Sequence, residues 1–139
     1  MKPKTYDELL GGPQGGRECA GRGILDHVTS RWGVLVLLAL RDGTHRFSEL
    51  RRRIGGVSEK MLAQTLRALE EDGFVLRHDF GEVPPRVEYT LTPMGRQLAR
   101  HVAGLATWIA DNTPQVLAAR ETRRRPKRTA GGKNGAWSA

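Results

Sequence analysis

Two short amphipathic helices separated by a glycine-containing turn are the feature that most constrains how this chain can fold. The segment Phe47–Ile54 has apolar residues at positions i, i+3 and i+7, and Gly55-Gly56 ends that pattern. Ser58 then suits the N-cap of a second helix that runs to about Asp72. Two helices joined in this way are typical of a helix-turn-helix motif.

The apolar pattern changes from helical to alternating after Gly73. Residues 75–80 and 86–91 are rich in β-formers and predict the two strands of a hairpin, joined by the link GEVPP. Thr92-Pro93 predicts the start of a last helix, with Thr as the cap and Pro at the first position. We expect that helix to end at residues 112–114.

A long apolar helix is expected at the centre of the core. Residues 31–41 read RWGVLVLLALR, which is apolar nearly all round, and Ser30 can cap this segment. An earlier helix is expected over residues 21–29. The residues expected to face inward from it are Ile24, Leu25 and Val28. The order of elements predicts a mainly α fold with a small β-hairpin wing, an α+β winged helix-turn-helix domain.

The distribution of charge is more informative than the net charge of +8. Residues 120–139 carry seven Lys or Arg and one Glu, whereas the other 119 residues carry 16 basic and 14 acidic side chains, a net charge of only +2. A polyanion therefore has to bind a local patch together with the tail. We expect a flexible N-terminal arm at residues 1–18, one domain at 19–113 and a disordered basic tail at 114–139.

The sequence contains no signal for a membrane or for secretion. No stretch approaches the roughly 18 consecutive apolar residues that a membrane span needs, and the first residues contain no apolar signal segment. A single cysteine excludes an intramolecular disulfide. These features predict a cytoplasmic protein.

The second helix of the motif has two chemically different faces. Leu62, Leu66 and Leu69 fall on one side and are expected in the core. The opposite side is polar, with cations and Gln in the first turns and acids at residues 70–72. A helix that enters the major groove reads bases with its N-terminal residues, so this gradient favours DNA contact over a merely solvated face. The residues predicted to read bases are Ser58, Lys60, Gln64 and Arg67.

Arginines flank this helix on both sides in the sequence. Arg51 and Arg52 lie on the preceding helix, and Arg86 follows the tip of the hairpin. Phosphate contacts from these side chains would fix the register of the reading helix, and Arg86 is also a candidate for the minor groove. Arg53 is expected to turn toward the body of the domain.

The stretch from Cys19 to about Ile109 resembles the HxlR-type winged helix-turn-helix regulators. The matching segments are RWGVLVLLAL, RFSELRRRIGGVSEKMLAQTLRALEEDGFV and EVPPRVEYTLTPMGRQL. The resemblance covers about two thirds of the chain. It implies a homodimeric, DNA-binding transcriptional regulator whose dimer is built from the N-terminal and C-terminal helices. It also implies that Cys19 is a candidate sensor, since some relatives sense oxidants or electrophiles through the matching cysteine.

The last helix carries a near-heptad row of apolar residues. One small domain should not expose this much apolar surface, so we expect a partner helix from a second subunit. The residues predicted for this dimer interface are Leu98, Val102, Leu105, Trp108 and Ile109.

Cys19 is the one residue with redox chemistry apart from three methionines. Its neighbours Arg17 and Arg22 favour the reactive thiolate, whereas Glu18 opposes them. A small thiol is also a common packing residue. Two interpretations are therefore open at this position, a sensor that reacts with a small oxidant or electrophile and an ordinary packing side chain.

Together these patterns predict a sequence-specific transcriptional regulator that binds a palindromic DNA operator as a homodimer, with Cys19 as a candidate sensor of oxidants or electrophiles. No nucleophile elbow, phosphate loop or carboxylate pair indicates an enzyme, and the scattered histidines form no metal-binding pattern. We therefore expect no catalytic residue, no metal and no cofactor. The alternative is a sequence-indifferent nucleic-acid-binding winged-helix protein, either chromosome-associated or RNA-binding. The weakly charged body favours the site-specific interpretation.

Overall fold

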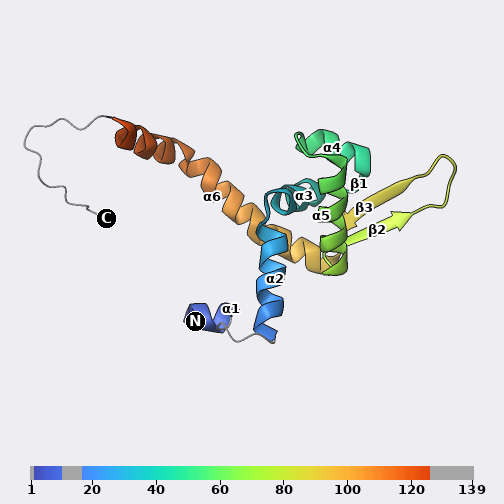
Figure 1. Cartoon of the computed structure of the whole chain (residues 1–139), viewed down its shortest axis with the longest axis horizontal. Coiled ribbons are helices and arrows are strands. Elements are labelled where there is room, and N and C mark those ends of the chain that lie inside the picture. The colour runs from blue at the N-terminus through green and yellow to red at the C-terminus, as the bar shows by residue number, and fades with distance from the viewer. Residues whose placement is uncertain (1, 11–16, 126–139) are drawn as a thin grey trace, which may run out of the picture. The chain divides into compact units, whose positions relative to one another are not determined.

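The computed structural model describes residues 2–10 and 17–125, with the backbone alone at residues 10 and 17–19. Its elements are α1 (Tyr6–Leu10), α2 (Arg17–Thr29), α3 (Arg31–Arg41), β1 (His45–Arg46), α4 (Phe47–Ile54), α5 (Glu59–Glu71), β2 (Val75–Asp79), β3 (Val87–Leu91) and α6 (Pro93–Arg124) (Figure 1). The chain forms two compact units, of which the first ends at Gly104 and the second begins at Leu105. The boundary lies within α6, and each unit is described by itself.

Helix α3 is at the centre of the first unit, as its sequence predicts. The hydroxyl of Ser30 caps it by accepting a hydrogen bond from the N–H of Gly33 at 3.1 Å. Val36 and Leu37 are fully buried, and α2, α4, α5 and β3 all contact this helix. The wider core includes Leu50, Leu62, Leu66, Leu69, Phe74, Val75, Leu91 and Ala99.

The turn between α4 and α5 is built by the residues that the sequence singles out. Gly55 caps α4 with φ of 73°, a left-handed conformation that residues with a side chain rarely adopt. The hydroxyl of Ser58 caps α5 by accepting a hydrogen bond from the N–H of Met61 at 3.0 Å. Val57, in the turn itself, is buried and anchors it to the core. The predicted helix-turn-helix motif is confirmed.

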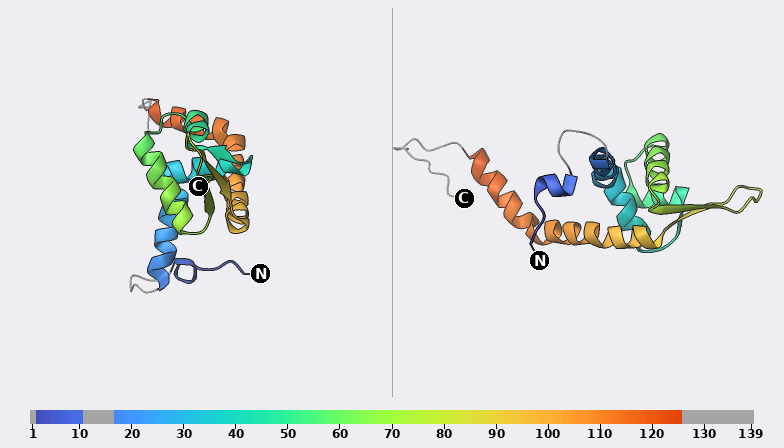
Figure 2. Two further views of the ribbon diagram at one scale, coloured as in Figure 1. Left: turned by 90° about the vertical axis from the view of Figure 1, so that its right-hand side faces the viewer. Right: turned by 90° about the horizontal axis from the view of Figure 1, so that it is seen from below.

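The wing is a three-stranded antiparallel sheet with the strand order β1–β3–β2. Its two hairpin strands are confirmed to within one residue, and the hairpin extends beyond α3, α4 and α5 (Figure 2). The sequence does not predict β1, because two residues are too short to show an alternating pattern. In β1, His45 pairs with Tyr89 and so joins the start of α4 to the wing.

The predicted N-terminal arm contains the short helix α1. The backbone N–H of Thr5 donates to Oε2 of Glu8 at 2.7 Å, and this bond holds the pKa of Glu8 below its usual range. In return the Thr5 hydroxyl accepts from the N–H of Glu8 at 3.3 Å. Helix α1 contacts α2, where Arg22 donates to the Tyr6 hydroxyl at 3.2 Å. The flexibility expected of residues 1–18 stays a prediction.

Two expectations about the helices are wrong. Helix α6 does not end at residues 112–114 but continues to Arg124, so the first part of the predicted tail is helical. In α2, Ile24 and Leu25 do not face inward, because they are 41% and 42% exposed, whereas Val28 is buried. The N-terminal turns of α2 extend past α3 and α5 (Figure 1).

Candidate DNA-binding surface

Helix α5 buries one face and exposes the other. Its three leucines, Leu62, Leu66 and Leu69, are at most 1% exposed, as predicted. All four predicted base-reading residues are exposed, namely Ser58, Lys60, Gln64 and Arg67. The last three follow one another at roughly one-turn spacing and therefore lie along one solvent-facing side of the helix. Ser58 differs from them because its hydroxyl is already occupied as the cap.

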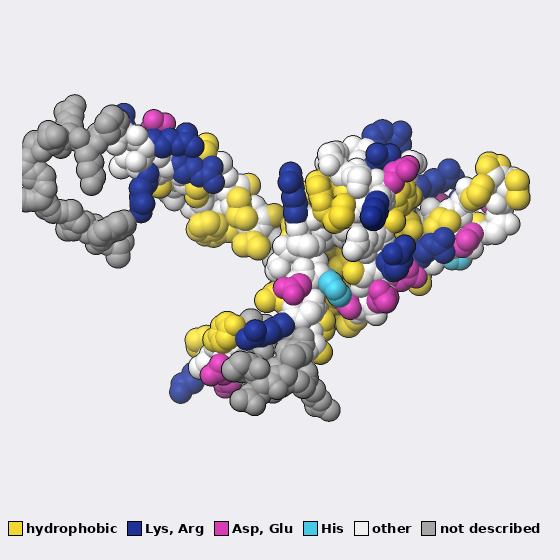
Figure 3. Space-filling model, viewed as in Figure 1, with side chains coloured by type: hydrophobic (Ala, Val, Ile, Leu, Met, Phe, Trp, Pro, Cys, Tyr) yellow, Lys and Arg dark blue, Asp and Glu magenta, His cyan; other side chains and the backbone are white. Residues whose placement is uncertain are grey.

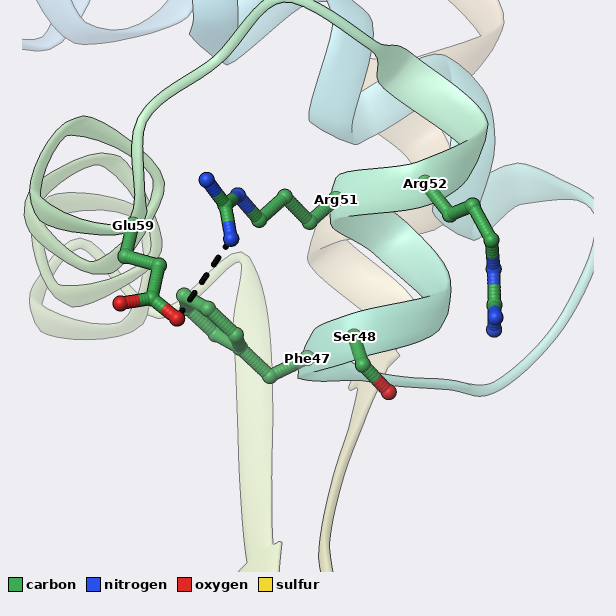
Figure 4. A pocket seen from close by; sticks show the side chains of 5 residues that line it. All are labelled: Phe47, Ser48, Arg51, Arg52 and Glu59. Carbon is green, nitrogen blue, oxygen red and sulfur yellow. Dashed lines mark ion pairs between the residues drawn. The ribbon is translucent and has the colours of Figure 1, made fainter.

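Arg51 links the two helices of the motif. Its Nε donates to the carbonyl oxygen of Val57 at 3.2 Å, and its Nη1 lies 3.5 Å from Oε1 of Glu59. Figure 4 shows the side chain reaching from α4 toward α5 across an open pocket of about 360 Å³, which Phe47 and Ser48 also line. A phosphate contact from Arg51 therefore has to compete with Glu59.

The other two arginines of α4 have different surroundings. Arg52 is exposed and points away from Arg51 (Figure 4), and it forms no ion pair with any residue that the structure describes. Arg53 turns toward the body of the domain, as predicted, where it pairs with the carboxylate of Asp42 and lies 3.3 Å from Nε2 of His45. Arg52 is therefore the arginine of α4 with the most freedom to contact a phosphate.

Arg86 is held within the wing by three partners. Its Nε donates to Oε2 of Glu88 at 3.3 Å, and its Nη1 lies 3.6 Å from Oε1 of Glu82. Its guanidinium also lies 3.9 Å from the centre of the Phe80 ring. The predicted minor-groove contact would require Arg86 to leave these partners, so the geometry weighs against that role.

The wing as a whole is not a basic arm. Residues 75–88 carry two arginines and three carboxylates, a net charge of −1. The tip is apolar, since Val83 is 97% exposed there, and Figure 3 shows hydrophobic side chains at the end of the hairpin. Lys and Arg side chains lie over α4 and α5 in the same view, and others lie near the base of the hairpin and on the C-terminal part of α6.

A contact that the sequence does not predict joins α2 to the end of α5. Nδ1 of His27 lies 2.6 Å from Oδ2 of Asp72. These residues are 45 positions apart, so no helical spacing relates them and only the tertiary fold brings them together. The contact connects the helix that contains Cys19 to the predicted reading helix.

The residues predicted for the dimer interface divide into two groups. Val102 is only 7% exposed, and Leu98 is partly buried and packs against the core, so both already contribute to the first unit. Their place in the dimer interface stays a prediction. In the second unit, Leu105, Trp108 and Ile109 are 57%, 59% and 51% exposed. These three side chains form an apolar surface on α6 that the other residues of the second unit do not cover.

Some predicted features fall outside the described part of the structure. Cys19 lies within α2, but its side chain is not among those described. Residues 126–139 of the basic tail lie outside the described residues altogether. Within the described ranges, no group of three or more His, Cys, Asp or Glu could hold a metal ion. No single described helix is long and apolar enough to cross a membrane, although residues 20–29 and α3, bent by 70°, meet that test as a pair, as buried core helices also do.

The sequence profile of the HxlR-like helix-turn-helix family matches residues 27–117, which include the motif and the wing. The chain belongs to this family. The HTH-type transcriptional regulator YtfH of Escherichia coli (strain K12) is 64% identical to it over 106 residues, 76% of this chain and 84% of that protein. An HTH-type regulator of Methanothermobacter thermautotrophicus is 41% identical over 90 residues, 65% of this chain and 69% of that protein.

Solved structures support the same assignment. The structure of ytfH from Salmonella typhimurium has a TM-score of 0.73 and 64% identity, covering 79% of this chain and 98% of that chain. The redox regulator HypR in its reduced form has a TM-score of 0.65 and 35% identity, covering 70% and 96%. The predicted resemblance and fold class are confirmed, and this HxlR-family chain is a transcriptional regulator of the helix-turn-helix type, not an enzyme.

Proposed function

We propose that this HxlR-family regulator binds a palindromic operator as a homodimer, with α5 in the major groove. The observation that carries the proposal is the division of α5 into buried leucines and an exposed side with Lys60, Gln64 and Arg67. Gln suits bidentate contact with adenine and Arg with guanine. Ser58, at the N-terminus of α5, is the fourth base-reading residue of the proposal.

The arginines proposed to contact the DNA backbone differ in whether a carboxylate of the protein already binds them. Arg52 contacts a phosphate directly, because no described carboxylate competes for it. Arg51 and Arg86 reach phosphates only by exchanging Glu59, or Glu82 and Glu88, for DNA. The basic residues beyond 120 add affinity for any duplex through counterion release and carry no sequence preference.

The dimer forms through the apolar side of α6 at Leu105, Trp108 and Ile109. Three large apolar side chains exposed within little more than one helical turn favour burial against a second copy. A two-fold dimer presents two copies of α5 to two half-sites related by symmetry, which is why the operator is palindromic.

A redox response through Cys19 is the second part of the proposal. HypR is named as a redox regulator, and YodB from B. subtilis has been solved both in a reduced form and after diamide treatment. Cys19 lies on α2, and α2 contacts the C-terminal end of α5 through His27 and Asp72. Modification of Cys19 therefore acts on a helix that contacts the reading helix.

The base-reading role is tested with a duplex selected from a random library by the protein itself. Gln64→Ala and Arg67→Ala should each lower affinity for the selected duplex by about 1–3 kcal/mol and reduce its advantage over random DNA. The matched controls are Gln97→Ala and Arg100→Ala, exposed residues of the same types on α6, which should leave that advantage unchanged.

Two outcomes would contradict the proposal. If Gln64→Ala and Arg67→Ala keep the full advantage of the selected duplex, α5 does not read bases. If the wild type binds all duplexes equally, the chain is the sequence-indifferent nucleic-acid-binding protein of the alternative hypothesis.

A further inference from the structure

A cleft of about 430 Å³ lies between α5 and the hairpin strands. Its lining residues are Ala63, Leu66, Arg67, Glu70, Arg77 and Tyr89. The four from α5 are spaced at i, i+3, i+4 and i+7, so they share one side of the helix. Arg77 of β2 and Tyr89 of β3 are direct partners across the antiparallel pair and complete the opposite wall.

The floor of this cleft is buried and its rim is exposed. Leu66 and Tyr89 are 1% and 8% exposed and belong to the core. Arg67 and Arg77 are exposed, so their guanidinium groups can move toward a ligand without disturbing the fold. Two forked donors above a fixed floor suit an anion with several oxygen atoms, such as a phosphate.

The charges around the cleft leave both guanidinium groups available. Arg67 forms no ion pair with the described residues. The nearest carboxylate to Arg77 is that of Asp79 at 3.9 Å, at the outer limit of an ion pair, and both side chains are about half exposed, so this pair is weak. Arg86, with two closer carboxylates, is the opposite case. Glu70 is the one acid in the cleft lining, and its charge opposes an anion.

The position of the cleft decides which phosphate reaches it. This step rests on the proposed function, in which α5 occupies the major groove. The hairpin then approaches the neighbouring groove, and the sugar-phosphate strand that separates the two grooves has to pass between α5 and the hairpin. The cleft lies between those same two elements.

We propose that the cleft is a phosphate seat, in which Arg77 binds a backbone phosphate of the strand that crosses between α5 and the wing, and Arg67 at the rim contributes its positive charge. Arg77 thereby becomes a DNA-contacting residue. In this proposal Arg77, and not Arg86, is the arginine of the wing that binds the phosphate. Arg67 contacts a base, as in the proposed function, and only its charge adds to the seat. Glu70 weakens the seat.

The first test measures binding to a random-sequence duplex over a range of salt concentrations. Arg77→Gln should lower affinity about tenfold and reduce the salt slope by about one. Arg100→Gln removes the same charge from an exposed position of α6 and should change affinity less than about twofold. Glu70→Gln should raise affinity about two- to fivefold, a gain that a folding defect could not produce.

The second test identifies the source of the phosphate. In a selected duplex, single phosphates are replaced in turn by uncharged methylphosphonates. One position in each half-site should weaken wild-type binding about tenfold and leave Arg77→Gln binding unaffected. Inorganic phosphate is added to the protein without DNA in a parallel titration. Phosphate binding that depends on Arg77, without any sensitive methylphosphonate position, would overturn the assignment to DNA and make the cleft a site for a free anion.

The seat and the proposed function fail in different ways. A wild type that binds no duplex removes the proposed function. A wild type that binds normally, with Arg77→Gln and Glu70→Gln both unchanged in affinity and salt slope, overturns the seat alone.

Discussion

The junction between Phe74 and the start of α6 leaves no room for a side chain at position 95. The N–H of Thr92 donates to the carbonyl oxygen of Phe74 at 3.0 Å. The Thr92 hydroxyl donates to the carbonyl oxygen of Gly73 at 2.6 Å and accepts from the N–H of Gly95 at 3.0 Å. A Cβ on Gly95 would lie 2.0 Å from the Phe74 carbonyl oxygen. Both sides of this contact are backbone, so neither can move away without breaking these bonds.

Gly95→Ala should therefore lower the free energy of unfolding by about 1–3 kcal/mol. The matched control is Gly104→Ala in the same helix, where an added Cβ meets no atom within 4 Å. That control should raise the free energy of unfolding by about 0.5–1 kcal/mol, because alanine favours the helix. Urea unfolding of both variants gives the comparison, and equal midpoints for the two would contradict the close contact at Gly95.

At the level of elements, the parts of the fold that have a chemical start or stop signal could be predicted from the sequence. Ser30, Gly55 and Ser58 cap the helices as predicted, because capping depends on the residue itself and its near neighbours. Strand β1 could not be predicted, since its two residues form a strand only by pairing with β3. The length of α6 was also missed.

Helix α6 continues through Pro114. Proline removes the backbone donor at its own position, and its ring crowds the carbonyl one turn earlier, which disfavours a helix interior by about 3 kcal/mol or more. The side chains just before it are satisfied within the helix, since Nδ2 of Asn112 donates to Trp108 and the hydroxyl of Thr113 donates to Ile109, at 2.8 Å and 2.6 Å. Asn, Thr and Pro in succession do not end this helix, although each is a weak helix former.

The candidate DNA-binding surface could also be predicted only in part. The exposed side of α5 follows from helical periodicity, and the sequence predicts it. The partners of Arg51 and Arg86 could not be predicted, because they depend on how the turn and the wing fold back on themselves. The same applies to the contact of His27 with Asp72.

The uncovered apolar side of α6 yields an element-scale prediction. Trp108→Asp places a charge among Leu105 and Ile109 and should convert a dimer at micromolar concentration into a monomer, because a carboxylate is costly to bury. Thr107→Asp introduces the same charge on the opposite side of the helix and should leave the dimer intact. Sedimentation velocity measures both variants. A wild type that is already monomeric at these concentrations would remove the proposed interface.

At the scale of the whole molecule, the proposed response to oxidants requires Cys19 to influence DNA binding from α2. A mild oxidant or a quinone should change operator affinity of the wild type by roughly fivefold or more, the usual range for coupling between sites. Cys19→Ser should show no change, and a reducing thiol should restore the wild type if the product is a disulfide. Superimposable binding curves for reduced and oxidised wild type would return Cys19 to the role of a packing residue.

The unequal distribution of charge along the first unit has a kinetic consequence. Residues 46–67, from the start of α4 to Arg67, carry six Lys or Arg and two Glu, a net charge of +4, whereas residues 68–88, the end of α5 with the wing, carry two Arg and six Asp or Glu, a net charge of −4. Near a duplex these opposite signs exert a torque on the first unit, because residues 46–67 are attracted while the end of α5 and the hairpin are repelled. The molecule is therefore turned before it touches DNA, and more of its collisions begin with α5 foremost. Added salt shortens the reach of this field, so it should slow association by making the approach less oriented.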